Sequence, residues 1–344
     1  MFDLSTHMDL GDIFNNTFKL IKNTIGRNII IVIVFLIPTG VFMAYGMESF
    51  YNQLFHLTKS LKDTGSGDAN FTFFVNFFEG MGYYFFTIFI FSLGHLAASN
   101  GITKLSYEEM LGNKLSLGSV YEEIFSKIYL KSIGQILLVL VILSTILTGS
   151  IVISIILFKA NNDFFHVLGG LLLAACLPLT LYLYFRWYFA LTSIVCEDKG
   201  VFEAFPKSSF LVKNYWWRTF GIIILFTIII QFAISIISTP VSFSLMWGYF
   251  SKYFSTLTEQ SMNKPNPAQL FENLKSIGFT LGLLTVLGRL LSVLVEPLFR
   301  VVMYVDLKIR KNDIELLSSR LGVETQSDNN HDEPQNGETP IDQS

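Results

Sequence analysis

The last long apolar run of the sequence, residues 276–310, constrains the fold more than any other stretch. The hydrocarbon core of a bilayer is about 30 Å thick, and roughly 20 apolar residues span it as a helix. Within this run Arg289, Glu296 and Arg300 are spaced seven and four residues apart, so they share one face of a helix. Charge at that depth in lipid is costly and normally faces a protein interior or a wet cavity. The run therefore predicts a membrane-spanning helix whose polar face is covered by other helices.

Five further apolar runs precede this one, and together they predict an all-α, polytopic integral membrane protein built as a six-helix bundle. Charged residues make up only 15% of the chain, well below the ~25% of soluble proteins, which supports this prediction. The predicted spans are residues 28–47, 80–103, 132–158, 164–184, 219–240 and 277–304.

The predicted domain organisation has three parts. Residues 1–27 form an amphipathic cytoplasmic segment, and residues 28–320 form the membrane domain. Residues 321–344 are acidic, rich in Asn and Gln and almost free of apolar side chains, so they are predicted to be a disordered cytoplasmic tail. A polar loop is expected after the first span, up to about Phe78, and an outer loop contains the helix-breaking residues 263–267.

Three amphipathic stretches are each predicted to form a helix in the membrane interface. They are residues 1–27, where apolar side chains follow helical spacing from Leu10, then residues 104–131, and finally residues 200–218. Each opens near a glycine and leads into a helical hairpin, which suggests a weak threefold repeat. A six-span protein with short loops can show the same pattern without a repeat, so both interpretations stay open. Pro206 is expected to break the third stretch.

The distribution of Lys and Arg predicts the orientation of the chain. Sixteen of these residues fall in the N-terminal segment, in the loops after spans two and four, and after span six, whereas six fall in the other three loops. Because cytoplasmic loops are enriched in Lys and Arg, both termini and the three amphipathic stretches are expected in the cytoplasm. Trp216 and Trp217, beside Arg218, fit an aromatic belt at that face.

No motif of the sequence predicts catalysis, a metal site or a cofactor. Cys176 and Cys196 lie 20 residues apart, which gives neither a disulfide framework nor a metal site. Glu108–Glu109 and Glu122–Glu123 have no His, Cys or Asp at metal-ligand spacing, so we interpret them as solvated surface. A phosphate-binding glycine loop, a nucleophile elbow and a His-Glu-x-x-His helix are not found in the sequence. The net charge of −3, with no basic stripe, argues against a nucleic-acid partner.

Two short patches of the chain resemble a family of bacterial six-span proteins. One patch, Tyr304–Arg310, has an aromatic residue followed by Asp, an aliphatic residue, a basic residue and Arg. The other begins at Arg186 and its aromatic neighbours, passes an acidic turn at Glu197, and ends near Trp217. The family is named for the membrane domain of glycerophosphoryl diester phosphodiesterases, so the expected location is the bacterial cytoplasmic (inner) membrane.

What this resemblance implies about activity is limited. In the named members the membrane domain accompanies a separate catalytic barrel, and most stand-alone members have no established activity. Such a barrel needs about 250 residues of alternating strands and helices. The sequence contains no segment of that kind, so the phosphodiesterase activity is not carried over, and we expect the chain not to be an enzyme.

The candidate intramembrane polar or lipid-phosphate site is centred on Arg289. This residue lies about 15 residues, or roughly 22 Å, from the cytoplasmic end of its span. It either faces a cavity and holds an anionic group such as a lipid phosphate, or it pairs with Glu296 and joins span six to its neighbours. The pairing is the favoured interpretation. Glu296 is also spaced to pair with Arg300 one helical turn later.

Four other residues complete the set of candidates. Arg186, at the exit of span four, either binds a lipid phosphate or only follows the positive-inside bias, and the second reading is favoured. His95, in span two, is interpreted as hydrogen-bonded packing more readily than as a ligand or proton relay. Asp306 and Arg310 are expected to form a one-turn pair that caps span six.

Two functions fit these observations, and both involve membrane lipids as partners. The first is a non-catalytic module that organises lipid or a partner protein, which includes a second copy of the chain. The alternative is a transporter or lipid-translocating protein that uses the charged stripe of span six. A membrane-embedded enzyme is a third, less supported class. A polar cavity that reaches Arg289 would favour transport, whereas a sealed and paired Arg289 would count against it.

Overall fold

The computed structural model describes residues 2, 7–63, 69–160, 162–259 and 267–311, and their regular secondary structure is entirely α-helical. The predicted tail, residues 321–344, lies outside the described residues, as does most of the breaker segment 263–267. The helices are α1 (Leu10–Asp63), α2 (Ala69–Met110), α3 (Leu117–Ile124), α4 (Lys127–Phe158), α5 (Asp163–Arg186), α6 (Ala190–Glu197), α7 (Val201–Val212), α8 (Trp216–Glu259) and α9 (Pro267–Arg310).

Six helical segments are long and apolar enough to cross a membrane, and each contains one of the six predicted spans. Their number and order are therefore confirmed for the described residues. The segments are Leu10–His56, Phe77–Met110, Lys127–Phe158, Asp163–Glu197, Trp216–Gly248 and Ile277–Arg310.

The N-terminal amphipathic stretch does not form a separate helix, so that prediction is wrong. α1 continues through the expected boundary at residue 28 and is 54 residues long. Lengthening an existing helix is easier than nucleating a new one, and no proline stands near this boundary. The apolar face of the stretch packs into the bundle, because Ile13 and Leu20 have no exposed surface. The ring of Phe14 lies 6.1 Å from that of Phe226 between centroids, which fixes this part of α1 against α8.

The other two amphipathic stretches each contain a short separate helix, α3 and α7. α3 begins after Ser116, whose hydroxyl accepts a hydrogen bond from the backbone N–H of Ser119. The expectation that Pro206 breaks the third stretch is wrong, because Pro206 lies inside α7. A proline costs the helix one backbone hydrogen bond. Burial of Ala204 and Leu211 against the rest of the protein offsets that loss.

The predicted long loop after the first span is mostly helix. α1 extends to Asp63 and α2 begins at Ala69, so only residues 64–68 separate them. The polar residues 159–163 predict a five-residue turn between the third and fourth spans. The observed connection is one residue shorter, because α4 ends at Phe158 and α5 begins at Asp163. The side chain of Asn162 caps α5 by accepting a hydrogen bond from the N–H of Phe164 at 2.9 Å.

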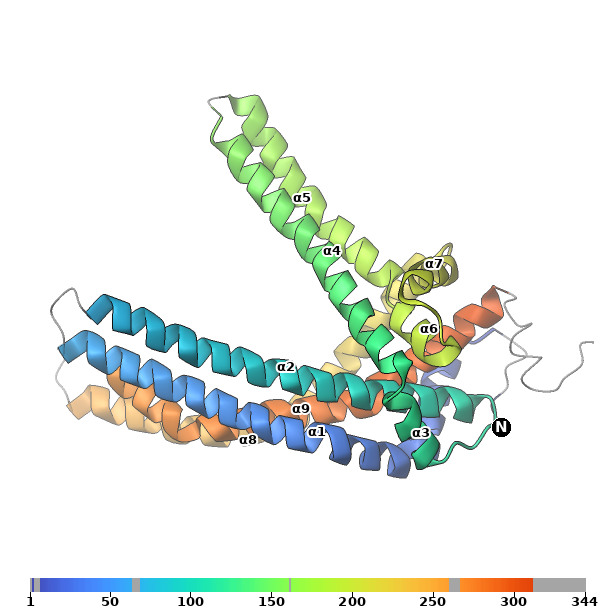
Figure 1. Cartoon of the computed structure of the whole chain (residues 1–344), viewed down its shortest axis with the longest axis horizontal. Coiled ribbons are helices and arrows are strands. Elements are labelled where there is room, and N and C mark those ends of the chain that lie inside the picture. The colour runs from blue at the N-terminus through green and yellow to red at the C-terminus, as the bar shows by residue number, and fades with distance from the viewer. Residues whose placement is uncertain (1, 3–6, 64–68, 161, 260–266, 312–344) are drawn as a thin grey trace, which may run out of the picture.

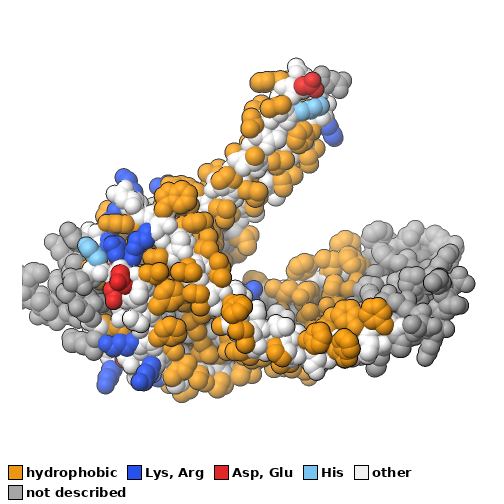
Figure 2. Space-filling view, turned by 180° about the vertical axis from the view of Figure 1, so that it is seen from behind, with side chains coloured by type: hydrophobic (Ala, Val, Ile, Leu, Met, Phe, Trp, Pro, Cys, Tyr) orange, Lys and Arg blue, Asp and Glu red, His pale blue; other side chains and the backbone are white. Residues whose placement is uncertain are grey.

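The helices form two arms that diverge from a common end (Figure 1). The larger arm contains α1, α2, α8 and α9, and the smaller arm is the α4–α5 hairpin. α3, α6 and α7 gather where the arms meet, and we call this end the junction. In the most apolar part of α4 no residue is buried. In the corresponding part of α2, 56% of the residues are buried. Figure 2 shows hydrophobic side chains over both arms, with Lys and Arg gathered mainly at the junction.

The core is centred on the C-terminal half of α9. From Leu298 to Ile309 every residue except Arg300 is buried. The ring of Phe299 stacks on that of Phe226 at a centroid distance of 3.6 Å. Farther from the junction α9 lies directly against α1, since a β-carbon on Gly282 would sit 2.6 Å from the Cα of Ala44. These contacts hold α9, and the charged stripe on it, in a fixed position in the larger arm.

Candidate functional site

Asp306 is the centre of a buried ion-pair cluster at the junction. Its carboxylate has no exposed surface and accepts hydrogen bonds from Arg218 at 2.7 Å and from Arg310 at 3.0 and 3.1 Å. The backbone N–H of Met8 donates to the same carboxylate at 3.0 Å, and both arginines donate to the Met8 carbonyl. The predicted contact between Asp306 and Arg310 is therefore observed. The cluster also ties the segment before α1 to α8 and α9, which spacing along one helix does not indicate.

A second buried cluster joins α6 to α9 through Glu197. Its Oε1 atom accepts hydrogen bonds from the hydroxyl of Tyr304 at 2.6 Å and from Nζ of Lys308 at 2.7 Å. Lys308 is 1% exposed and Tyr304 is fully buried, so Glu197 supplies the charge that compensates this ammonium group. Lys207 of α7 lies 3.9 Å from the other carboxylate oxygen.

Three of the carboxylates interpreted as solvated are instead paired at the junction, so that interpretation is wrong for them. Glu109 contacts Arg27 at 2.6 Å, while Lys104 lies 3.6 Å from Glu108 and 2.8 Å from Glu123. The physical reason is that α2 extends to Met110, which brings these residues against α1 and α3. In the described part of the chain, no group of three His, Cys, Asp or Glu side chains could hold a metal ion.

The charged stripe of α9 is not internally paired. Glu296 accepts a hydrogen bond from the hydroxyl of Ser292, four residues earlier. Arg300 lies over the ring of Tyr188, with its guanidinium carbon 5.1 Å from the ring centroid. The described residues contain no ion pair between Glu296 and either arginine. The favoured pairing of Arg289 with Glu296 is therefore wrong, since two helical turns, about 10.5 Å along the axis, separate them.

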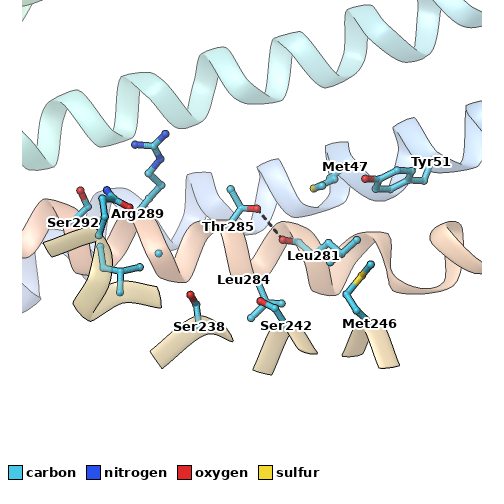
Figure 3. A pocket seen from close by; sticks show the side chains of 13 residues that line it. Met47, Tyr51, Ser238, Ser242, Met246, Leu281, Leu284, Thr285, Arg289 and Ser292 are labelled. Carbon is cyan, nitrogen blue, oxygen red and sulfur yellow. Dashed lines mark hydrogen bonds between the residues drawn. The ribbon is translucent and has the colours of Figure 1, made fainter. Parts of the chain in front are cut away.

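Arg289 lies between two cavities and contributes to the lining of both. The first cavity, of about 650 Å³, lies between α1, α8 and α9 and is lined partly by Ser238, Ser242 and Gln231 of α8. Figure 3 shows Arg289 extending from α9 away from these serines and toward α2. The second cavity, of about 470 Å³, lies on that side and also contains His95 and Arg300. Thr285 joins Arg289 as the other residue lining both cavities.

These cavities carry positive charge, which Glu296 offsets only in part through its electrostatic interaction with Arg300. Neither is lined by Asp or Glu, and Arg289 is an exposed side chain with no ion-pair partner among the described residues. His95 lies beside Phe91, with ring centroids 6.4 Å apart, and takes part in no hydrogen bond within the described residues. An uncompensated cation at the depth predicted for Arg289 favours a bound anion, because lipid solvates charge poorly. The arrangement can hold an anionic group beside apolar surface.

Arg186 is not brought to the stripe of α9. It ends α5, with its guanidinium 5.9 Å from the ring centroid of Tyr182, and it lines a separate small cavity at the junction. The candidates named from the sequence thus divide into four groups. Arg289, Arg300 and His95 share a cavity, and Asp306 and Arg310 form a buried cluster. Glu296 lies outside the described linings of both cavities and contacts Ser292, and Arg186 stands apart.

The polar face of α8 was missed at the sequence level. Gln231, Ser238 and Ser242 are seven and four residues apart and line the first cavity together. Their spacing on one helical face is the same signal that identified the stripe of α9, but neutral side chains carry less weight in an apolar span. Arg218 and Met8, the other partners of Asp306, had no local signal, because they lie far from it in the sequence. The same holds for the partners of Glu197 on α9.

Comparison with known proteins places the chain in a family. No curated protein and no solved structure matches it. No link to glycerophosphoryl diester phosphodiesterases emerges from these comparisons, and that resemblance stays a prediction. The matching family is described as a domain of unknown function (DUF7847), and the match covers residues 101–307, more than half of the chain. It includes α3 to α8 and most of α9, and thereby Arg289, Glu197 and Asp306, so this chain belongs to the DUF7847 family.

Proposed function

We propose that the chain is a non-catalytic, multi-pass integral membrane protein that holds an anionic amphiphile, such as a phospholipid, between its helices. The observation that carries this proposal is Arg289, a cation that lines two cavities and has no ion-pair partner among the residues that the structure describes. The resemblance to a membrane domain that accompanies a separate enzyme agrees with a non-catalytic role. Six apolar helices, with few charges outside the junction, support membrane insertion.

The second cavity suits an amphiphile because it combines cations with apolar surface. An anionic head group would contact Arg289 and Arg300, with His95 beside them. The apolar lining includes Phe91 of α2 and Ile136 of α4, so the cavity lies between the two arms. Acyl chains would continue along the exposed apolar surface of those arms (Figure 2), in contact with the surrounding bilayer.

We further propose that the junction lies at the cytoplasmic face of the bacterial inner membrane. The test is to label introduced cysteines with a membrane-impermeant maleimide in intact cells. We expect Lys159→Cys, between α4 and α5, to be labelled from outside and Ser344→Cys to be labelled only after lysis. Both native cysteines are buried, so they add little background. Labelling of the tail in intact cells would show that the orientation is inverted.

The lipid site is tested by purifying the protein in mild detergent and identifying the co-isolated lipids by mass spectrometry. We expect the Arg289→Leu protein to retain about tenfold less anionic phospholipid, because one charge-assisted contact to the head group is lost. Arg289→Lys should retain most of the lipid, since the positive charge stays. Lys159→Leu is the matched control, because it removes an exposed cation at the far tip of the hairpin. Equal lipid in Arg289→Leu and the natural protein would remove this site.

Lipid translocation is the second candidate, and the sharing of Arg289 and Thr285 by two cavities favours it. The same variants decide between the two functions once they are reconstituted into vesicles with a fluorescent phospholipid. Transfer of that lipid between leaflets by the natural protein, but not by Arg289→Leu, would select translocation. Lipid retention without transfer would select static binding.

A further inference from the structure

A smaller cavity at the junction contains two cations that do not belong to the site around Arg289. It has a volume of about 180 Å³ and lies between the end of α5, the end of α7 and the start of α8. Arg186 and Lys213 supply its charge, and Ser209 and Asn214 supply neutral polar groups. The remaining lining residues are Tyr182, Val212 and Trp216.

Arg186 and Lys213 differ from most other cations at the junction in having no carboxylate partner among the described residues. The described lining of their cavity includes no Asp or Glu, and both side chains are exposed. Junction cations that do contact a carboxylate are Arg27, Lys104, Lys131, Lys207, Arg218, Lys308 and Arg310. Two neighbouring cations without an acidic partner leave this cavity with a net positive charge, which favours an anionic ligand.

The aromatic residues around the cavity are typical of the interface between a membrane and water. The indole N–H of Trp216 donates to the carbonyl of Tyr182 at 3.4 Å, and its ring stacks on Phe220 at a centroid distance of 5.0 Å. Next to it Trp217 is 77% exposed, and Phe210 of α7 is half exposed. Large exposed aromatic rings of this kind are enriched at the level of lipid head groups. The cavity therefore lies where the phosphate of a phospholipid would be found.

We propose that this cavity binds the phosphate of an anionic phospholipid from the leaflet on the junction side. Arg186 and Lys213 flank the phosphate, while Ser209 and Asn214 offer further hydrogen-bond donors. The volume admits a head group and excludes the acyl chains, which lie along the exposed leucines of α5, including Leu177 and Leu181. This inference rests on the membrane insertion proposed above but is independent of Arg289.

The test measures tryptophan quenching in the full-length protein reconstituted into phosphatidylcholine vesicles. The vesicles contain increasing amounts of phosphatidylglycerol that is brominated near the glycerol end of its acyl chains. We expect the natural protein to be quenched at a low fraction of this lipid, because Trp216 lines the cavity. The double variant Arg186→Gln/Lys213→Gln should need about tenfold more of it, since two charge-assisted contacts are lost.

Matched variants separate the cavity from general surface charge and from the site at Arg289. Lys22→Gln/Lys114→Gln removes two exposed cations from the junction outside the cavity and should behave like the natural protein. Arg289→Leu should also be quenched normally, so a failure of the proposed function at Arg289 leaves this result unchanged. The exchange Arg186→Lys/Lys213→Arg keeps both charges and should restore quenching, which distinguishes binding from a folding defect.

Two results would overturn this inference and leave the proposed function unaffected. The first is equal quenching of the natural protein and the Arg186→Gln/Lys213→Gln variant. The second is reversal of quenching by millimolar inorganic phosphate, which would identify a soluble anion as the ligand in place of a lipid. A further measurement uses vesicles in which the phosphatidylcholine is brominated. If this lipid does not quench the tryptophans either, the protein is not inserted in the membrane, which would contradict both this inference and the proposed function.

Discussion

The Asp306→Asn protein is expected to lose about 3 kcal/mol or more of its free energy of unfolding. The carboxylate of Asp306 is fully buried and is the shared acceptor of Arg218, Arg310 and the Met8 N–H. Removing its charge leaves two guanidinium groups facing each other with their compensating anion gone. It also releases the segment before α1, because the position of Met8 depends on the same cluster.

The measurement is thermal or denaturant unfolding of the purified protein in detergent, followed by tryptophan fluorescence. Asp198→Asn is the matched control, since Asp198 forms an ion pair with Lys131 but its side chain is 67% exposed. Asparagine also tolerates the positive φ of 54° at that position, so the control adds no backbone strain. The control should lose less than about 1 kcal/mol. Similar losses in both proteins would contradict a special role for the Asp306 cluster.

The second large effect is expected at Glu197. Replacing Glu197 with leucine leaves the ammonium group of Lys308 buried without its carboxylate, at a cost of about 3 kcal/mol or more. The double variant Glu197→Leu/Lys308→Met should recover most of that loss, because it removes both charges and fills the site with apolar side chains. Unfolding of the two single variants and the double variant gives the coupling free energy directly.

Lys207→Met is the control for this second prediction. Lys207 lies 3.9 Å from the same carboxylate, and its side chain is 16% exposed, so it is partly solvated and its loss should be much smaller. Additive losses in the double variant would show that Glu197 and Lys308 act independently. In that case the hydrogen bond of 2.7 Å between Nζ of Lys308 and the Glu197 carboxylate would not contribute the expected coupling free energy to stability.

Some parts of the fold were predictable because they depend on local sequence. Six long apolar runs gave six long apolar helices, since the length and composition of each run are properties of a single segment. The turn between α4 and α5 was also predictable, to within one residue, from the polar residues 159–163. The continuity of α1 was not predictable, because a change from amphipathic to apolar sequence alters what a helix faces without ending it.

In the candidate site, too, some features were predictable from local sequence and others were not. Spacing alone placed Arg289, Glu296 and Arg300 on one face of α9, but it suggested ion pairs that do not form. Ser292 and Tyr188 are the observed partners of Glu296 and Arg300, and Tyr188 comes from a distant part of the chain. Within the described ranges Arg289 has no ion-pair partner and lies between two cavities, as a result of how α1, α2, α8 and α9 pack together.

The sequence by itself therefore determined the helical class, the six apolar helices and the positions of the charged residues along them. Only the tertiary structure decided which charges are neutralised by buried partners and which remain available at a cavity. The physical reason is that helix formation depends on residues a few positions apart, whereas charge compensation depends on polar groups that can lie about 300 residues away, such as the backbone N–H of Met8 that donates to Asp306.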